Sequence, residues 1–166
     1  MGGDLGGISV MADRVDPDPR IFSDSEFRHL LAREVQRSTR YQDFLTLCLV
    51  RPDYPGEPDP QIHGEIARAL AELLRATDVL GLMDETIGIL LLHTPHAEAL
   101  AVMERVRNHI VESFARSGAL GPGVGIALHL GLVSFPEHAT DDAALLAKAQ
   151  ESLAASGSGD AAPPSA

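Results

Sequence analysis

The stretch that decides the fold is Arg75-Ala76-Thr77-Asp78-Val79-Leu80-Gly81-Leu82-Met83-Asp84-Glu85-Thr86-Ile87-Gly88-Ile89-Leu90-Leu91. Its first residues read as the end of a helix. The rest reads as strand, turn and strand, because apolar runs flank the polar pair Asp84-Glu85. We therefore expect a β-hairpin whose strands cover about residues 78–83 and 86–92.

Four helices are predicted around this hairpin from apolar residues at helical spacing. The first begins at Ser23, with Glu26 three residues later, which is the pattern of a capping box. The others cover about residues 62–74, 97–116 and 140–153. The apolar residues expected to face the core are Phe27, Leu30, Leu31, Val35, Ile62, Ile66, Leu70, Leu73, Leu74, Leu100, Met103, Val106, Ile110, Phe114, Leu145, Leu146, Ala149 and Leu153.

Two further strands complete the expected sheet. Residues 44–50 are nearly all apolar, as in a strand that is covered on both faces. Residues 124–134 follow a Gly-Pro-Gly break and form a second long strand, whereas four prolines predict a loop over residues 51–60. The order α-β-α-β-β-α-β-α predicts an α/β fold, an α+β sandwich with a ferredoxin-like or palm-like sheet that contains a β-hairpin and has flanking helices.

Length and composition predict one domain. The 166 residues are 45% hydrophobic, which is enough for a sizeable core. We assign this domain to residues 21–155. Residues 1–20 and 156–166 have the Gly-, Pro-, Asp- and Ser-rich composition of disordered N-terminal and C-terminal tails.

The charge excludes several classes of partner. A formal net charge of −11 disfavours nucleic acid and anionic membranes, which both reward clustered cations. No apolar run is long enough for membrane insertion, and the N-terminus lacks the basic and apolar regions of a signal peptide. The one cysteine, Cys48, lies in an apolar run and reads as a buried hydrophobic residue rather than a reactive thiol. We expect a cytoplasmic protein.

Nearly the whole predicted domain, about residues 16 to 155, resembles a GGDEF domain, the catalytic domain of diguanylate cyclases. The resemblance lies in four segments taken in order, residues 31–50, 66–82, 87–110 and 128–153. The last of them carries Gly131 and Phe135-Pro136 where the family has equivalent residues. The resemblance implies the palm-like fold of nucleotidyl cyclases, and it also implies self-association into a homodimer.

The signature turn of the family is not present in this chain. In the family, a Gly-Gly-Asp/Glu-Glu-Phe turn lets the backbone approach a nucleotide phosphate and supplies a carboxylate to a metal ion. The corresponding residues here are Met83, Asp84, Glu85, Thr86 and Ile87, without a glycine. The resemblance therefore implies a degenerate signature turn.

The other parts of the cyclase site are also missing. The family has a metal-binding carboxylate where the first strand ends, but this chain has Arg51-Pro52, and Asp53 follows two residues later. The segment that would read guanine is shortened to the proline-rich run, and the phosphate-binding lysine has no counterpart near Ser156. Loss of one electrostatic contact to a transition state typically costs about 10²–10³ in rate. We therefore expect no catalytic residues, no cofactor, no metal site and no enzyme activity.

Two readings of the remaining carboxylates stay open. Asp53, Asp84 and Glu85 could rebuild a Mg²⁺ site, since Mg²⁺ favours carboxylate ligands. Alternatively, Asp84 and Glu85 are ordinary polar residues of an exposed hairpin turn.

One functional pattern of the family persists, Arg75-x-x-Asp78. In GGDEF proteins this pattern forms an inhibitory site for cyclic di-GMP. Arginine can donate to the Hoogsteen edge of guanine, and a carboxylate can accept from its Watson–Crick edge. The structural alternative is that Arg75 complements a helix C-terminus and that Asp78 caps the turn into the strand.

The histidines are weaker candidates for a metal site or a catalytic base. His93 and His96 are three residues apart, but they lie in a loop without a third ligand nearby. His129 lies within a strand, as either a packed histidine or a catalytic base.

The leading hypothesis is a catalytically inactive GGDEF-like module for regulation and protein–protein interaction in bacterial signalling. If a fold persists after its chemistry is lost, its surface is the remaining candidate for function. The alternatives are a cyclic di-GMP receptor that uses Arg75 and Asp78, and a divergent active nucleotide cyclase. The expected partners are a signalling protein, cyclic di-GMP under the first alternative, and a second copy of the chain.

Overall fold

The computed structural model describes residues 18–159, so most of the two predicted tails lies outside the described residues. The predicted order of helices and strands is confirmed, with one short strand added at the start. The elements are β1 Ile21–Phe22, α2 Asp24–Tyr41, β2 Leu45–Asp53, α3 Pro60–Leu73, β3 Val79–Met83, β4 Thr86–Leu92, α4 His96–Ser117, β5 Ala127–Phe135 and α5 Asp142–Gly159.

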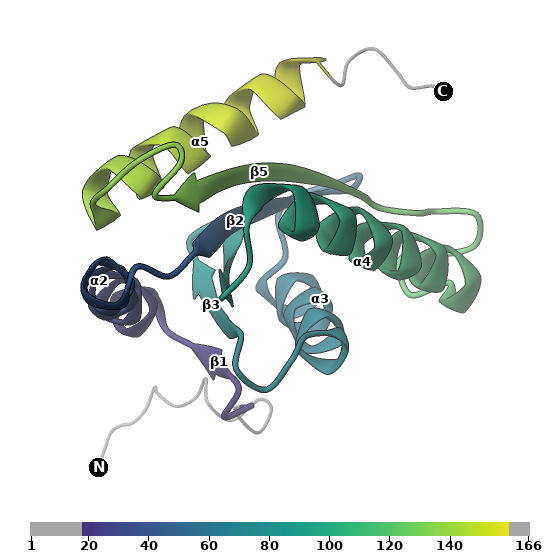
Figure 1. Cartoon of the computed structure of the whole chain (residues 1–166). Helices are drawn as coiled ribbons and strands as arrows, with labels where there is room; N and C mark the ends of the chain where they lie inside the picture. Colours follow the sequence, from purple (N-terminus) through teal and green to yellow (C-terminus); the bar gives the residue numbers. More distant parts are fainter. Residues whose placement is uncertain (1–17, 160–166) are drawn as a thin grey trace.

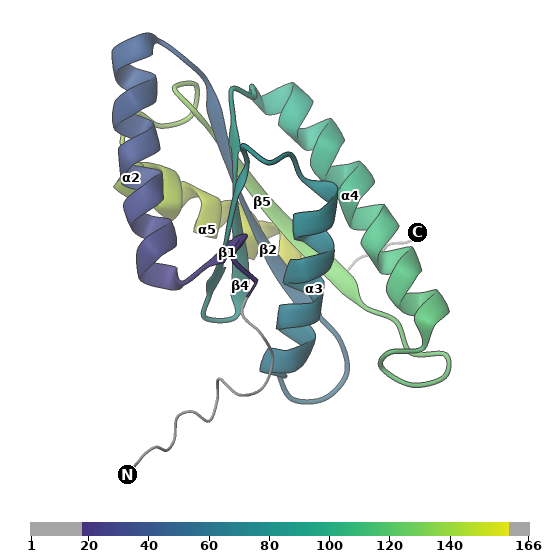
Figure 2. The same ribbon diagram turned by 90° about the horizontal axis from the view of Figure 1, so that it is seen from below.

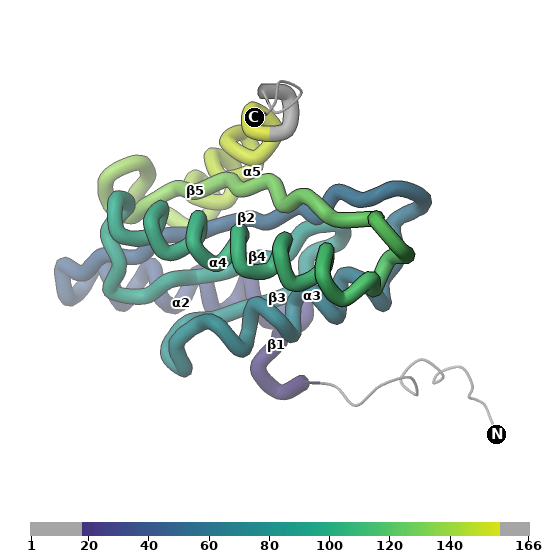
Figure 3. Tube along the Cα trace, turned by 90° about the vertical axis from the view of Figure 1, so that its right-hand side faces the viewer, coloured from purple at the N-terminus to yellow at the C-terminus, as the bar shows by residue number. Residues whose placement is uncertain are grey.

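A five-stranded mixed sheet in the order β1-β3-β4-β2-β5 forms the middle layer. The short β1 pairs parallel to β3, and all other neighbours are antiparallel. Helices α3 and α4 cover one face, and α2 and α5 cover the other (Figures 1 and 2). In the side view of the Cα trace, α3 and α4 lie in front of the sheet and α2 lies behind it (Figure 3). The predicted α+β sandwich is therefore confirmed.

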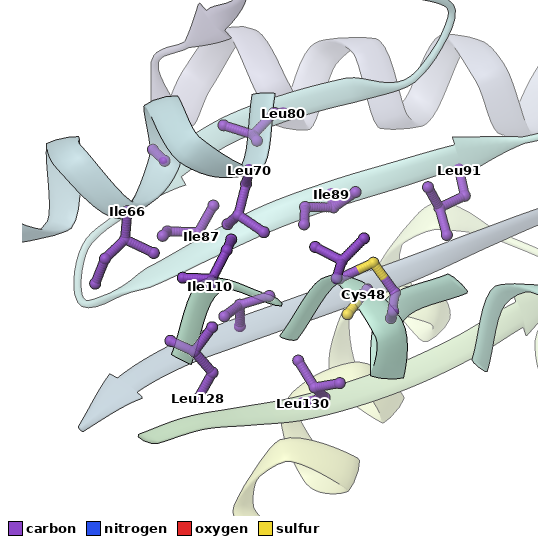
Figure 4. Close-up of a cluster of buried hydrophobic side chains, with 14 of the residues drawn as sticks. Cys48, Ile66, Leu70, Leu80, Ile87, Ile89, Leu91, Ile110, Leu128 and Leu130 are labelled. Atoms are coloured by element: carbon purple, nitrogen blue, oxygen red, sulfur yellow. The ribbon is translucent and has the colours of Figure 1, made fainter. Parts of the chain in front are cut away.

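Each face of the sheet has its own hydrophobic core. On the α3/α4 side, Ile66, Leu70 and Ile110 pack on apolar side chains of β2, β4 and β5 (Figure 4). On the α2/α5 side, the helices contribute Phe27, Leu31, Val35, Leu145, Ala149 and Leu153. Because strand side chains alternate between faces, the continuous apolar runs of β2 and β4 serve both cores.

Helix α2 packs on the hairpin through Phe27. Gly81 of β3 and Gly88 of β4 are directly opposite each other in the antiparallel ladder. A Cβ at either glycine would lie within 3.0 Å of Phe27 side-chain atoms. The two glycines therefore form the flat floor on which this ring lies, and they set how closely α2 approaches the sheet.

The predicted capping box at the start of α2 is confirmed. The Glu26 backbone N–H donates to Ser23 Oγ at 3.3 Å, and the Ser23 backbone N–H donates to Glu26 Oε1 at 2.9 Å. The box satisfies two backbone donors that would otherwise lack a partner at the helix N-terminus.

The prediction of a loop over residues 51–60 is wrong at both ends. Strand β2 continues through Pro52 to Asp53, and α3 begins at Pro60. β2 pairs with β4 only as far as Val50 and then pairs with β5 alone. A proline is tolerated there because one side of the strand has become an edge, and a proline is also favoured in the first turn of a helix.

Other boundaries and burial assignments also differ from the predictions. β5 begins at Ala127 rather than 124, and α5 continues to Gly159, four residues beyond the predicted domain end. Leu73 and Leu100, which were expected in the core, are exposed. No helix within residues 18–159 combines the length and the apolar character that crossing a bilayer requires.

Candidate functional site

The hairpin turn between β3 and β4 holds the residues predicted to correspond to the signature turn, Met83 to Ile87. Asp84 adopts a left-handed backbone with φ of 52°, and both Asp84 and Glu85 are exposed. Thr86 closes the turn, because its hydroxyl donates to the Met83 carbonyl at 3.0 Å. Met83 and Ile87 are buried in the two cores. The ends of the signature thus belong to the hydrophobic interior, and only the two acidic residues face outward.

A pocket of about 280 Å³ lies beside this turn, where β2 ends. Its ionisable lining comes from Arg51 and Asp53 of β2, from His63 of α3 and from Glu85 of the turn. The register of β2 and β4 places the end of β2 next to the hairpin, since Val50 pairs with Ile87. The structure therefore brings Asp53 and Glu85 to the same pocket, but Asp84 does not line it.

Three side chains that line this pocket have neighbours that hold them in place. Asp53 Oδ2 lies 3.2 Å from His129 Nε2, across the ladder between β2 and β5. The Tyr54 hydroxyl accepts from the Asp59 backbone N–H at 2.8 Å, which closes the proline-rich loop on itself. The Tyr54 ring meets His63 edge-on, with 5.8 Å between the ring centroids. His129, one of the predicted candidates, thus lies in the sheet as a partner of Asp53.

The charge of His63 is set mainly by burial. Burial lowers its pKa, and the nearby carboxylates of Glu85 and Asp59 offset this only in part. The imidazole is therefore neutral at pH 7, since a lowered pKa favours the uncharged ring. The permanent cation of the pocket is Arg51.

The predicted metal alternative finds no complete ligand set. Among residues 18–159, no group of three or more His, Cys, Asp or Glu side chains is placed to hold a metal ion. His93 and His96 also point to different partners: His93 pairs with Asp43, and His96 Nδ1 lies 3.2 Å from the Ser134 hydroxyl.

Arg75 and Asp78 are bonded to each other at the end of α3. The Arg75 backbone N–H donates to Asp78 Oδ2 at 3.0 Å, and its guanidinium donates to Asp78 Oδ1 at 3.2 Å. The same guanidinium donates to the Leu92 carbonyl and to the Thr94 hydroxyl. The Asp78 side chain is only 2% exposed, whereas Arg75 is 56% exposed. This geometry ties the end of α3 to the loop that precedes α4.

A second pocket, of about 440 Å³, opens beside this pair. Arg20 and Arg75 supply its cationic side, and Glu72 and Asp78 supply its anionic side. The two arginines come from segments more than fifty residues apart in the chain, so the sequence alone could not place them together.

Sequence reasoning missed a buried polar network between β2 and β5. Thr46 and Ser134 are paired in the ladder, and their hydroxyl oxygens are 2.6 Å apart. Thr46 also donates to the Thr94 carbonyl, and the Ser134 backbone N–H donates to His138 Nδ1 at 3.0 Å. The only signal was one small polar residue within each apolar strand, which does not reveal a cross-strand partner.

Comparisons with known proteins identify solved structures that have the same fold. No protein-family model matches the chain, and no curated protein matches it. Solved structures do. A DGC protein from Thermotoga maritima is similar over 81% of this chain and 96% of its own, with 22% identity and a TM-score of 0.67.

Two further structures are similar. The diguanylate cyclase SiaD from Pseudomonas aeruginosa, solved with its activator SiaC, matches 92% of this chain with 20% identity and a TM-score of 0.73. The match spans 62% of the SiaD chain. The GGDEF domain of DgcB from Caulobacter crescentus, solved with c-di-GMP, matches 87% of this chain and 91% of its own, with 13% identity and a TM-score of 0.68. The chain therefore has the palm-like fold of GGDEF diguanylate cyclase domains.

Proposed function

We propose that this chain is a GGDEF-like domain without cyclase activity, which serves as a regulatory, protein-binding module in bacterial cyclic di-GMP signalling. The observation that carries the proposal is that Arg51 lines the pocket beside the hairpin turn, together with Asp53 and Glu85. A cyclase of this fold needs a free metal-binding carboxylate where β2 ends. The last residue of β2 here is Asp53, whose carboxylate contacts His129, and the cation of Arg51 in the same pocket repels a metal ion.

The state of the other groups supports the same proposal. Asp53 is bonded to His129, and Asp84 lies outside the pocket. No glycine stands between Met83 and Ile87 to let the backbone approach a phosphate. Each missing contact would lower the rate by about 10²–10³, so the combined loss removes measurable turnover.

The protein-binding role is supported by the intact fold. Both hydrophobic cores are complete, so the domain holds a stable surface although its catalytic residues are lost. The SiaD structure was solved with an activator protein, which shows that a chain containing this fold can be held in a protein complex. We extend that role to the present chain.

The test of lost activity is incubation with GTP and Mg²⁺ or Mn²⁺, followed by chromatography of the products. We expect no cyclic di-GMP, while an active diguanylate cyclase assayed in parallel forms it. Product that is formed by the wild type and lost in Asp84→Ala would overturn the proposal.

A second candidate is a cyclic di-GMP receptor that uses Arg75 and Asp78. The pocket beside them favours it, because Arg20 and Arg75 could both face the phosphates of a dinucleotide. Binding would require the Arg75 guanidinium to leave the Leu92 carbonyl and the Thr94 hydroxyl. Calorimetric titration of wild type and Arg75→Ala decides between the two candidates. Heat in the wild type alone would support the receptor, and no heat up to about 100 μM would exclude it.

A further inference from the structure

The pocket beside the hairpin turn carries opposite charges that do not neutralise each other. We call this pocket of about 280 Å³ the hairpin pocket. Arg51, Asp53 and Glu85 all line it. Neither Arg51 nor Glu85 forms an ion pair or a hydrogen bond with any residue in 18–159, and Asp53 uses only Oδ2, which lies 3.2 Å from His129 Nε2. One guanidinium and two carboxylates are therefore available to a ligand.

The backbone of β2 keeps these charged groups apart. β2 pairs with β4 only as far as Val50, so its last three residues extend past the hairpin turn. Arg51 and Asp53 are two positions apart in the strand, which places their Cα atoms about 7 Å from each other. Glu85 belongs to a different element, the turn between β3 and β4. The separation of the charges is thus a property of the sheet rather than of flexible side chains alone.

The walls between the charges are held in place. The Tyr54 hydroxyl accepts from the Asp59 backbone N–H at 2.8 Å, and the Tyr54 ring meets His63 edge-on. Pro52 and Pro58 also line the pocket and restrict its backbone. A preformed site loses less conformational freedom when a ligand binds. The volume lies just below the range of about 300–1,000 Å³ for drug-sized ligands, so the pocket suits a small molecule.

The lining selects the charge of that molecule. His63 counts as neutral, because burial lowers its pKa. The pocket therefore has one permanent cation, Arg51, and two carboxylates, Asp53 and Glu85. The complementary ligand has one carboxylate and two cations. A phosphate group would face both carboxylates, whereas the net charge of −11 on the whole chain attracts cationic ligands.

We propose that the hairpin pocket binds a basic α-amino acid, arginine or lysine. Arg51 holds the α-carboxylate of the ligand, and Asp53 and Glu85 hold its α-ammonium group and its side-chain cation. Such charge-assisted hydrogen bonds are about twice as strong as neutral ones. The inference goes beyond the proposed protein-binding function and does not depend on it, because it assigns a small-molecule ligand to the pocket.

The first test is calorimetric titration of the full chain at constant ionic strength with L-arginine, L-lysine and two analogues of arginine. Agmatine lacks the carboxylate, and citrulline lacks the side-chain charge. We expect both amino acids to bind at least about tenfold more tightly than either analogue, because a site built for a charged group rejects a ligand that lacks it. Agmatine that binds as tightly as arginine, or no binding up to about 10 mM arginine, would overturn the proposal.

Variants then assign the contacts. Arg51→Gln should weaken arginine binding about tenfold and leave agmatine binding within about twofold, so the difference between these two ligands disappears. Asp53→Asn and Glu85→Gln should each weaken both ligands. Glu85 is exposed, so Glu85→Gln keeps the test valid if Asp53→Asn disturbs the fold through His129.

The matched control is Asp84→Asn. It makes the same charge change as Glu85→Gln at the neighbouring position of the turn, but Asp84 does not line the pocket. We expect the arginine affinity of this variant to stay within about twofold of the wild type. An equal loss in Asp84→Asn and Glu85→Gln would show general charge attraction and refute the site.

Cyclic di-GMP formation and arginine binding are measured separately, so the two proposals can fail independently. If the chain makes no cyclic di-GMP and arginine does not bind, the lost activity stands and the amino-acid site falls. If the chain makes cyclic di-GMP and arginine binds with the expected selectivity, the amino-acid site stands and the proposed function falls.

Discussion

At the scale of single residues, Arg75 and Asp78 illustrate how residues that were predicted to bind a ligand serve the fold. Asp78 accepts from the backbone of Arg75, and the Arg75 guanidinium reaches the Leu92 carbonyl and the Thr94 hydroxyl. These bonds join the end of α3 to the start of α4. The same two residues therefore contribute to stability whether or not a ligand binds beside them.

Asp78→Ala is expected to lower the free energy of unfolding by about 1–3 kcal/mol, because it leaves the Arg75 backbone N–H without its buried partner. Urea denaturation measures the change. The control is Glu72→Ala in the same pocket, an exposed position where we expect a change within about 0.5 kcal/mol. Equal stability of Asp78→Ala and wild type would show that the carboxylate has no structural role.

Cys48 is a second residue whose environment decides its chemistry. It is fully buried in the core on the α3/α4 side, and burial raises the pKa of its thiol strongly. The thiolate is the reactive form, so a raised pKa makes the group unreactive. We expect slow reaction with a disulfide reagent at pH 8 in the native protein and fast, complete reaction in concentrated urea. Fast reaction under native conditions would mean that the core opens readily.

At the scale of elements, the contact between α2 and the hairpin depends on one ring and two glycines. A Cβ at Gly88 would lie 2.8 Å from Phe27 Cε2 and 2.9 Å from the Met83 sulfur. Overpacking of this kind typically costs about 1–3 kcal/mol. The cost should depend on the ring, because leucine has no atoms at the positions of Cε2 and Cζ.

A double-mutant cycle tests this contact. We expect Gly88→Ala to destabilise the wild type by about 1–3 kcal/mol and to cost less in the Phe27→Leu background. Thermal and urea denaturation of the four proteins give the coupling energy. Gly125→Ala is the control, since a Cβ there meets nothing within 4 Å. Simple additivity of Gly88→Ala and Phe27→Leu would refute the proposed contact.

The N-terminus of α2 predicts a pH dependence. The backbone and hydroxyl of Ser23 hold the pKa of Glu26 below its ordinary value of 4.5. A lowered pKa means that the stabilisation is fully present above about pH 4.5 and is lost as the pH falls through the lower folded value. Ser23→Ala should cost about 0.5–2 kcal/mol at pH 7. Glu26→Gln should flatten the acid limb of the stability profile, and an unchanged limb would show that the box contributes nothing to it.

At the scale of the whole molecule, the net charge of −11 predicts a response to salt. The compact state suffers more self-repulsion than the expanded chain. Raising NaCl from about 10 to about 150 mM shortens the screening length from about 30 to about 8 Å and should raise the midpoint of thermal unfolding at pH 7. The same titration near the sequence pI of 4.9 should show little change. A midpoint at pH 7 that falls with salt would mean that ion pairs dominate.

The local sequence determined the elements of this protein and their order. The capping box at Ser23, the polar pair at Asp84-Glu85 and the helical spacing in α3 and α4 each depend on residues close in the chain, so they were predictable. Burial was less predictable, because Leu73 and Leu100 lie at helical spacing but outside the area that the sheet covers.

Only the tertiary structure decided which residues from distant parts of the sequence are in contact. Pairing of β2 with β5 allowed Pro52 into a strand, brought His129 to Asp53 and joined Thr46 to Ser134. Packing of α2 on the sheet buried the Ser38 hydroxyl without a hydrogen-bond partner among residues 18–159. These features depend on contacts between residues far apart in the chain, and periodicity carries information only about neighbours.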